Sequence, residues 1–323
     1  MLKTAMGLAC ALTLVTAPVN AAEEYPTRDI RMIVPWGAGG GTDGIVRKIT
    51  DLAEEPLSGT VYVENIEGGM SGNGLIQLIN AKADGYTLGA LTYDSVITVP
   101  WQDMLPGYSV DEMDLIARIT SEPDAIIVPA DSEHDSFEAL IEAAKAEPGA
   151  IRAGIQNMGA RTHLTLLQLM DATGADFKII SYPGGAAPQK EALLNGEIDL
   201  AVTSLGDFAS LIEGGDARGL IEFTDVQSQS FPDVPPASER DLDIQMGSFI
   251  ILAAPAGTPE PILDELEAAY QAAYESDEFQ DWLVDVGVTP NWLGRDEVTE
   301  WVDTTQEEIF ATMEELQEQG ILD

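Results

Sequence analysis

The sequence predicts an α/β protein with two lobes, and three observations support this prediction. First, short apolar segments with strand character alternate with helical segments along most of the chain. Such alternation is typical of parallel sheets that are covered by helices on both faces. Second, the alternation occurs in two successive sets of similar order. Third, two apolar segments near 125–128 and 247–252 bound the second set, so the chain is expected to cross between the lobes twice.

The first set contains three strands, each followed by a glycine-rich or polar loop. The strands are expected at 30–34, 60–64 and 86–91, and the loops after them at 37–43, 68–74 and 92–95. Helices are expected from about 44 to 54 and up to about 81. Because ligands of parallel sheets bind beyond the carboxyl ends of the strands, these three loops are the first candidates for a binding site.

The second set repeats this order of strands and helices. Its strands are expected at 125–129, 151–155, 177–180, 198–202 and 219–223, and helices at 136–146, within 159–169 and up to 194. A further strand at 249–254 precedes helices at 260–274, 277–286 and 296–319. These last helices are expected to pack on the first lobe. The predicted lobes are therefore 23–126 with 248–323, and 127–247.

The first 22 residues have the pattern of a secretory signal peptide. Lys3 supplies a positive charge, an apolar run follows from Ala5 to Val15, and small residues lead up to Ala21 and Ala22. The run is shorter than the ~20 apolar residues that span a bilayer, so cleavage after Ala21 or Ala22 and export to the periplasm are expected. The only cysteine, Cys10, lies in this run. The mature chain would therefore have no disulfide, thiolate metal site or cysteine nucleophile.

The charge of the chain is strongly negative, with 56 acidic and 15 basic residues and a net charge of −41. Nucleic-acid binding is excluded because phosphate contacts need clustered lysine and arginine. A uniformly acidic surface is tolerated where salt screens it, since the Debye length falls to ~3 Å at 1 M salt. The composition favours a halophilic acidic surface; the alternative is a merely acidic secreted protein.

Catalytic and cofactor signatures are few. The mature chain has two histidines, no metal-ligand spacing such as His-x-x-His, and no Gly-x-Ser-x-Gly segment. Gly39, Gly41 and Gly44, with Glu64 after them, match the spacing of a dinucleotide fingerprint. Export argues against that alternative, since nicotinamide cofactors are cytoplasmic. No cofactor, metal or catalytic residue is predicted, although catalysis by a carboxylate pair stays open among so many acids.

The glycine-rich loop at 37–43 is suited to an anion. Glycine has no side chain to keep a ligand from the backbone N–H groups, and the helix that follows adds its positive amino end. An anion could therefore be held without a basic side chain. The alternative is a tight turn capped by Thr42 or Asp43, which uses the same residues.

Several segments together resemble one family of receptors. They include Tyr25-Pro26 with Ile30–Asp43 (IRMIVPWGAGGGTD), Val63–Asn65, Ala83–Leu88 (ADGYTL), Thr162-His163-Leu164, Tyr182 with Gly184-Gly185, Leu194–Asp199 (LNGEID), Phe231–Pro236 (FPDVPP) and Ala253–Pro259 (AAPAGTP). In this order they resemble the solute-binding proteins of tripartite tricarboxylate transporters, the Bug or TctC-type receptors. The resemblance covers essentially all of the mature chain.

This resemblance implies a two-lobed periplasmic-binding-protein fold (type II-like) with a small carboxylate held in the interlobe cleft. It also implies delivery of that carboxylate to a membrane complex with one large and one small integral subunit. The protein itself is expected to be a monomer. The resemblance does not separate transport from a role in feeding a sensor kinase, which is the alternative function.

The expected ligand-binding residues come from loops in both lobes. They are Trp36, Gly37, Ala38, Gly39, Gly40, Gly41, Thr42, Asp43, Thr92, Tyr93, Arg161, His163, Tyr182, Gly184, Gly185, Thr203 and Ser204. Arg161 is expected to pair with a ligand carboxylate through two hydrogen bonds; the alternative is an ion pair with one of the many acids. Asp94 departs from the small polar residues usual in relatives. It would repel a carboxylate unless the ligand also carries an amine or hydroxyl.

Overall fold

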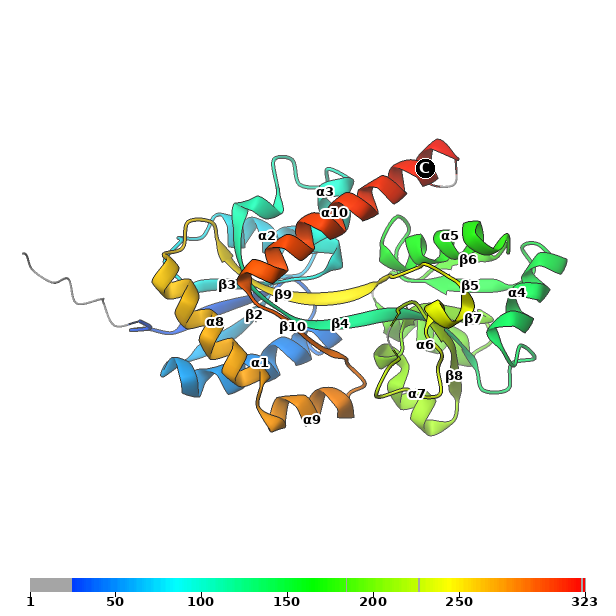
Figure 1. The fold of residues 1–323 in the computed structure, drawn as a ribbon, viewed down its shortest axis with the longest axis horizontal. Helices are drawn as coiled ribbons and strands as arrows, with labels where there is room; N and C mark the ends of the chain where they lie inside the picture. Colours follow the sequence, from blue (N-terminus) through cyan, green and yellow to red (C-terminus); the bar gives the residue numbers. More distant parts are fainter. Residues whose placement is uncertain (1–24, 184, 226, 321, 323) are drawn as a thin grey trace, which may run out of the picture.

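The computed structural model describes residues 25–183, 185–225, 227–320 and 322. The predicted signal peptide (1–22) and Gly184 lie outside the described residues. The protein is a mixed α/β structure with two lobes, side by side along its longest axis (Figure 1). This confirms the predicted fold class.

The sheet of the first lobe contains three parallel strands and three strands that run against a neighbour. The parallel strands are β1 (Ile30–Val34), β2 (Val61–Asn65) and β3 (Thr87–Leu91), in the order β2-β1-β3. β9 (Gly247–Pro255) pairs antiparallel with β3, β4 (Met113–Pro129) pairs antiparallel with β9, and β10 (Pro290–Leu293) pairs antiparallel with β4. β1 and β3 therefore end at the same edge, toward the second lobe (Figure 1).

The sheet of the second lobe continues from β4. It contains β5 (Arg152–Ile155), β6 (Lys178–Ser181), β7 (Leu200–Ser204) and β8 (Ala217–Glu222). β7 and β8 both pair antiparallel with β4, while β5 pairs parallel with both β6 and β7. β5 and β7 therefore end together, and their ends face the first lobe.

Helices cover both sheets. The α-helices are α1 (Gly41–Leu57), α2 (Gly72–Ile79), α3 (Val99–Trp101), α4 (Phe137–Ala146), α5 (Arg161–Thr173), α6 (Ala186–Leu194), α7 (Ala209–Gly214), α8 (Glu260–Tyr274), α9 (Asp277–Asp285) and α10 (Arg295–Glu318). Shorter turns are the π-helical η1 (Asp94–Thr98) and the 3₁₀ turns η2 (Val110–Glu112), η3 (Gly206–Phe208) and η4 (Ala237–Arg240). In the described part of the chain no helix has the length and apolar character of a membrane span.

β4 and β9 pass side by side through the junction of the lobes (Figure 1). Along β9, Ile250, Leu252 and Ala254 join the apolar cluster with α1 and α8, whereas Phe249 and Ile251 join the cluster with α10. This follows from the strand period of two, which sends successive side chains to opposite faces. One face of these strands is therefore covered by α8 and the other by α10.

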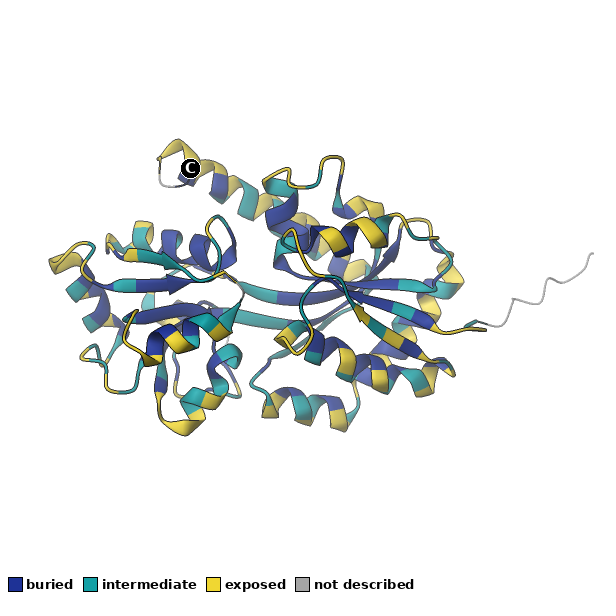
Figure 2. Ribbon diagram, turned by 180° about the vertical axis from the view of Figure 1, so that it is seen from behind, coloured by how far each residue is buried: buried dark blue, intermediate teal, exposed yellow. Residues whose placement is uncertain are grey.

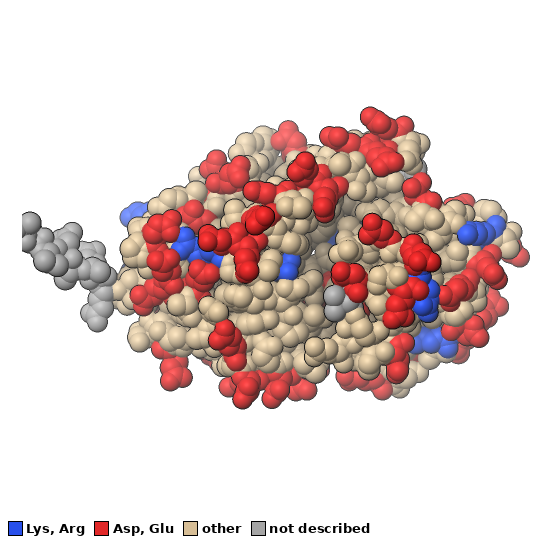
Figure 3. All heavy atoms as spheres, viewed as in Figure 1, with Lys and Arg blue, Asp and Glu red and all other residues tan. Residues whose placement is uncertain are grey.

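Buried residues concentrate on the strands, and exposed residues on the outer sides of the helices and on loops (Figure 2). Acidic side chains spread widely over the face that carries α10 (Figure 3).

Candidate functional site

The loop between β1 and α1 presents the amino end of a helix. Gly39 has φ +82°, a left-handed conformation that glycine adopts without strain, and Gly40 precedes the first helical residue. The first hydrogen bond of the helix runs from the Gly44 N–H to the Gly40 carbonyl at 3.0 Å. The N–H groups of Gly41 and Thr42 precede it, so the helix itself supplies them with no acceptor. They form a positive end suited to an anion.

Asp43 stabilises this loop from inside. Its carboxylate accepts hydrogen bonds from the Gly39 N–H (2.8 Å), from Asn65 Nδ2 (2.8 Å) and from Arg47 Nε (2.9 Å). Burial would raise the pKa of Asp43, but the hydrogen bonds from Arg47, Gly39 and Asn65 outweigh it and hold that pKa below its usual range. Asp43 thus stabilises the turn, as the alternative interpretation predicts, while Gly40 and Gly41 at the amino end of α1 stay exposed.

Trp36 and Thr92 lie beside this loop and contact each other. Trp36 Nε1 donates to Thr92 Oγ1 at 3.1 Å, and the Trp36 carbonyl accepts from Asn65 Nδ2 at 2.9 Å. Asn65 therefore ties the Trp36 backbone to Asp43, which fixes the entrance of the loop. The indole is half-buried.

The two residues after Thr92 point to different surroundings. The Tyr93 ring packs against Phe249, with ring centroids 6.2 Å apart, and lines a cavity on the α10 face of β4 and β9. Asp94 begins η1 and accepts a hydrogen bond from Thr98 Oγ1 at 2.7 Å. Burial raises the pKa of Asp94, although Thr98 and Arg161 oppose that shift. Tyr93 thus lines a cavity on the α10 face, while both Tyr93 and Asp94 lie within electrostatic range of Arg161 of the second lobe.

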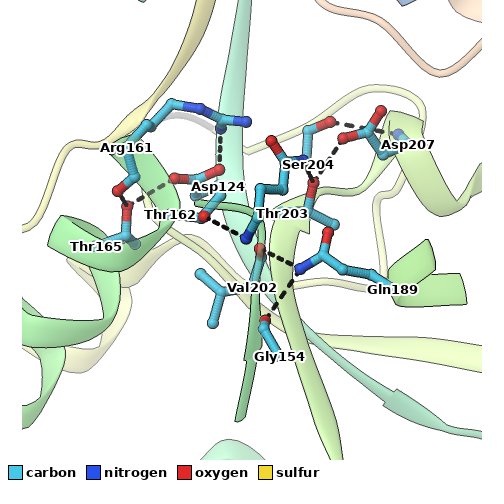
Figure 4. Close-up of polar contacts among 11 residues, drawn as sticks. Asp124, Gly154, Arg161, Thr162, Thr165, Gln189, Val202, Thr203, Ser204 and Asp207 are labelled. Carbon is cyan, nitrogen blue, oxygen red and sulfur yellow. Dashed lines mark hydrogen bonds and ion pairs between the residues drawn. The ribbon is translucent and has the colours of Figure 1, made fainter. Parts of the chain in front are cut away.

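Arg161 is held by an acid that the sequence analysis did not identify (Figure 4). Its Nη1 forms an ion pair with Asp124, a β4 residue with 0% exposure, while Arg161 is 9% exposed. Thr165 Oγ1 donates to the other oxygen of Asp124 at 2.6 Å. The pairing with an acid of the protein, weighed above as the alternative, is therefore what this structure contains. The outer guanidinium nitrogen points away from Asp124 (Figure 4).

The surroundings of Arg161 carry more negative than positive charge. Burial would lower its pKa, but four acids outweigh burial and hold the pKa above its usual value; in decreasing order they are Asp124, Asp207, Asp94 and Glu122. Glu122 lies two residues before Asp124 on the same face of β4. Burial, followed by the charge of Asp207, raises the pKa of Glu122 to about 7. One guanidinium thus faces four carboxyl groups.

A chain of hydrogen bonds joins the carboxyl ends of β5 and β7. Gln156 Nε2 donates to Thr203 Oγ1 at 3.0 Å, and Thr203 Oγ1 donates to Asp207 Oδ2 at 2.5 Å. The Gln156 N–H also donates to Thr162 Oγ1 at 2.9 Å, and the Asp207 N–H donates to Ser204 Oγ at 3.3 Å. The hydroxyl groups of Thr203 and Ser204 therefore serve first to position Gln156 and Asp207.

The remaining candidates of the second lobe lie around this chain of bonds. His163 Nδ1 accepts from the Gly159 N–H at 3.0 Å, and burial lowers the pKa of His163, so its imidazole is neutral at neutral pH. Tyr182 Oη donates to Glu197 at 3.4 Å on a more exposed wall. Gly185 has φ +92° immediately before α6, a conformation that favours glycine.

The two lobes touch at the edge of this region. Gln102 Nε2, after α3, donates to the Gly159 carbonyl at 2.9 Å. This contact brings the segment after β3 against the loop before α5. The loops after β1, β3, β5 and β7 thus border one interlobe region. Among the residues that the structure describes, no group of three or more His, Cys, Asp or Glu is arranged to hold a metal ion.

Comparison with known proteins gives consistent matches over nearly the whole chain. The family model described as "Tripartite tricarboxylate transporter family receptor" matches residues 45–317. A Cupriavidus necator protein, "UPF0065 protein in gbd 5'region", is 29% identical over 308 residues, which are 95% of this chain and 93% of the relative. Two solved structures are similar. A TctC solute-binding protein from Polaromonas is 27% identical with a TM-score of 0.76, covering 90% of this chain and 100% of that one. The periplasmic binding protein BugD is 26% identical with a TM-score of 0.78, covering 92% and 99%.

Proposed function

Because this chain belongs to the tripartite tricarboxylate transporter family of receptors, we propose that it is an exported periplasmic protein that binds a small organic carboxylate between its lobes. In this proposal it acts as a monomer and delivers the carboxylate to the large and small membrane subunits of a transporter. It binds without chemical turnover. The observation that carries the proposal is the position of the loops after β1, β3, β5 and β7 around one interlobe region.

The ligand carboxylate is proposed to dock first on the amino end of α1. Backbone N–H groups at a helix start bind anions without a basic side chain. Asp43 already fixes the conformation of the Gly37–Asp43 loop, so little ordering is needed when the ligand arrives. The second lobe then closes on the ligand with Arg161, Gly184-Gly185 and Thr203.

The acids around Arg161 favour a ligand that also carries an amine. Arg161 is already paired with Asp124, and Asp94, Glu122 and Asp207 add negative charge nearby. A second carboxylate placed there would meet like charges, whereas an ammonium group would be attracted by them. We therefore expect an amino acid rather than a plain dicarboxylate as the ligand.

The test is isothermal titration calorimetry of the chain that begins at residue 23, in high salt, with aspartate and with succinate. These two compounds share a carbon skeleton and differ by the amine. We expect aspartate to bind and succinate to bind at least about tenfold more weakly, since one ion pair to a buried charge is worth more than 1.4 kcal/mol. Succinate binding more tightly would contradict the amine assignment. If a wider panel of carboxylates and amino acids also gave no binding, the carboxylate proposal itself would be wrong.

Gly40→Val tests the loop. A Cβ at Gly40 would meet the Gly37 carbonyl oxygen at 3.4 Å, an ordinary contact, and the φ of −77° suits any residue. The variant should therefore fold, while its methyl groups cover the amino end of α1 and abolish ligand binding. Gly214→Val, in the exposed last turn of α7, is the matched control and should bind normally. Normal binding by Gly40→Val would show that the loop is not the anion site.

A further inference from the structure

A cavity lies behind the candidate site, on the α10 face of β4 and β9. Its volume is about 520 Å³, within the usual size of small-molecule sites. On β4, Ser121 and Pro123 line this cavity, whereas Glu122 and Asp124 belong to the surroundings of Arg161. Because successive strand residues point to opposite faces, the two regions lie back to back across the same strand.

Both lobes contribute walls to this rear cavity. β10 and α10 form one side, and Glu222 at the end of β8, with residues 223–225 and 227–230 after it, forms the other. Figure 3 views the face that carries α10 and shows the surface hollowed between the two lobes. The cavity is therefore open to a ligand from outside and distinct from the region that the glycine-rich loop borders.

Two buried donors in its lining lack a hydrogen-bond partner among the residues that the structure describes. Arg118 is 7% exposed; its Nη2 donates to Asn291 Oδ1 at 2.6 Å, but its Nε has no hydrogen-bond partner among the residues described. Tyr93 is 2% exposed, and its hydroxyl group likewise has no partner within the described structure. Buried donors are nearly always satisfied, because leaving one unpaired is costly. Each of these donors would be satisfied by a negatively charged acceptor in the cavity.

The remaining lining defines the rest of the ligand. The Arg118 guanidinium lies 4.3 Å from the centroid of the Trp301 ring, which holds it in place, and Phe249 packs edge-on against Trp301 at 4.8 Å. These rings offer apolar surface for a hydrocarbon body. Asp225 and Glu308 are exposed residues of the same lining and would repel a second negative charge on the ligand.

We propose that this rear cavity is a second binding site, which takes a small organic monoanion with an apolar body. The acid group of the ligand accepts hydrogen bonds from Arg118 Nε and the Tyr93 hydroxyl, and its body lies against Trp301 and Phe249. The proposal does not depend on the function assigned to the interlobe site in front of β4.

Benzoate is the probe, and the Gly40→Val chain is the background, because the front loop is blocked in it. Calorimetry should detect benzoate binding there. Benzamide, which lacks the charge, and terephthalate, which adds a second carboxylate at the far end of the ring, should each bind at least about tenfold more weakly. Absence of benzoate binding, or equal binding of the three compounds, would overturn the proposal.

Two further variants locate the probe. Arg118→Gln should weaken benzoate binding at least about tenfold. Arg28→Gln is the matched control and should not change it, since Arg28 is exposed and its guanidinium also stacks on an aromatic ring, with Cζ 3.9 Å from the centroid of the Tyr86 ring. Tyr93→Phe keeps the ring and removes only a hydroxyl group that has no hydrogen-bond partner in the described part of the chain. It should therefore leave the unfolding temperature unchanged and weaken benzoate binding several-fold. Benzoate affinity unchanged in both Arg118→Gln and Tyr93→Phe would place the probe elsewhere and refute the assignment.

Discussion

The Arg161–Asp124 pair gives the sharpest test of the electrostatics described here. Asp124→Asn keeps the size of the side chain and removes the negative charge beside Arg161. Asp124 has no exposed surface and Arg161 is 9% exposed, so the guanidinium would stay buried without its partner. Breaking a buried pair in this way costs about 3–5 kcal/mol of unfolding free energy.

The assay is denaturation by urea in high salt, in which the free energy of unfolding is extrapolated to water for each variant. Asp84→Asn is the matched control, because Asp84 pairs with the exposed Arg28 at 3.1 Å and should change stability by less than about 1 kcal/mol. Replacing both partners, Asp124→Leu with Arg161→Met, should recover only part of the loss, since it removes the broken pair but also the cation that faces Asp94, Glu122 and Asp207. If Asp124→Asn costs no more than the control, Arg161 is solvated in solution and is free to bind a ligand carboxylate directly.

Two other outcomes are expected. Asp94→Asn should reduce the preference for aspartate over succinate by about tenfold, because it removes one of the acids that face Arg161. Calorimetry with both ligands measures this preference. An unchanged preference would exclude Asp94 as an amine partner. Glu222 is 4% exposed, and burial raises its pKa from 4.5 to about 7. Between pH 4.5 and about pH 7, Glu222 is protonated in the folded chain but ionised in the unfolded chain. The free energy of unfolding therefore falls as the pH rises through this range, by about 3 kcal/mol in total. Glu222→Gln should therefore stabilise the protein above about pH 7 and have little effect below about pH 4.5; an equal effect at both ends would contradict the buried carboxyl.

The elements with simple periodicity were predictable from the sequence. The first strand was expected at 30–34 and lies there, and the last helix, expected at 296–319, is α10 at Arg295–Glu318. β4 was expected only at 125–129 but begins at Met113. Arg118, Glu122 and Asp124 break its apolar pattern, and the strand tolerates them because each charge meets a partner or a cavity in the folded protein.

The residues of the candidate site were likewise only partly predictable from the sequence. The loop after β1 was predictable because its glycines and the helix after them are contiguous in sequence. The partner of Arg161 was not, since Asp124 is 37 residues away and is brought close only when α5 packs against β4. The sequence did contain a signal for such a partner. Two acids, Glu122 and Asp124, come immediately before the apolar segment 125–129, where a buried charge needs a partner of opposite charge. Likewise, the positions of Tyr93 and Asp94 follow from η1, the turn that begins shortly after β3 and that the sequence did not predict.

The net charge of the chain and the charge of its candidate site favour the same class of ligand. At physiological ionic strength the Debye length is ~8 Å, so the acidic surface acts weakly on a distant anion but strongly on one that enters the region between the lobes. There, the amino end of α1 can hold one carboxylate, while the acids around Arg161 oppose a second. An acidic amino acid carries one net negative charge less than the dicarboxylate with the same carbon skeleton, so the acidic surface repels it less as it approaches. Its ammonium group also compensates acids that would otherwise destabilise each other in the closed form. We therefore expect an acidic receptor of this architecture to prefer an amine-bearing carboxylate to a tricarboxylate.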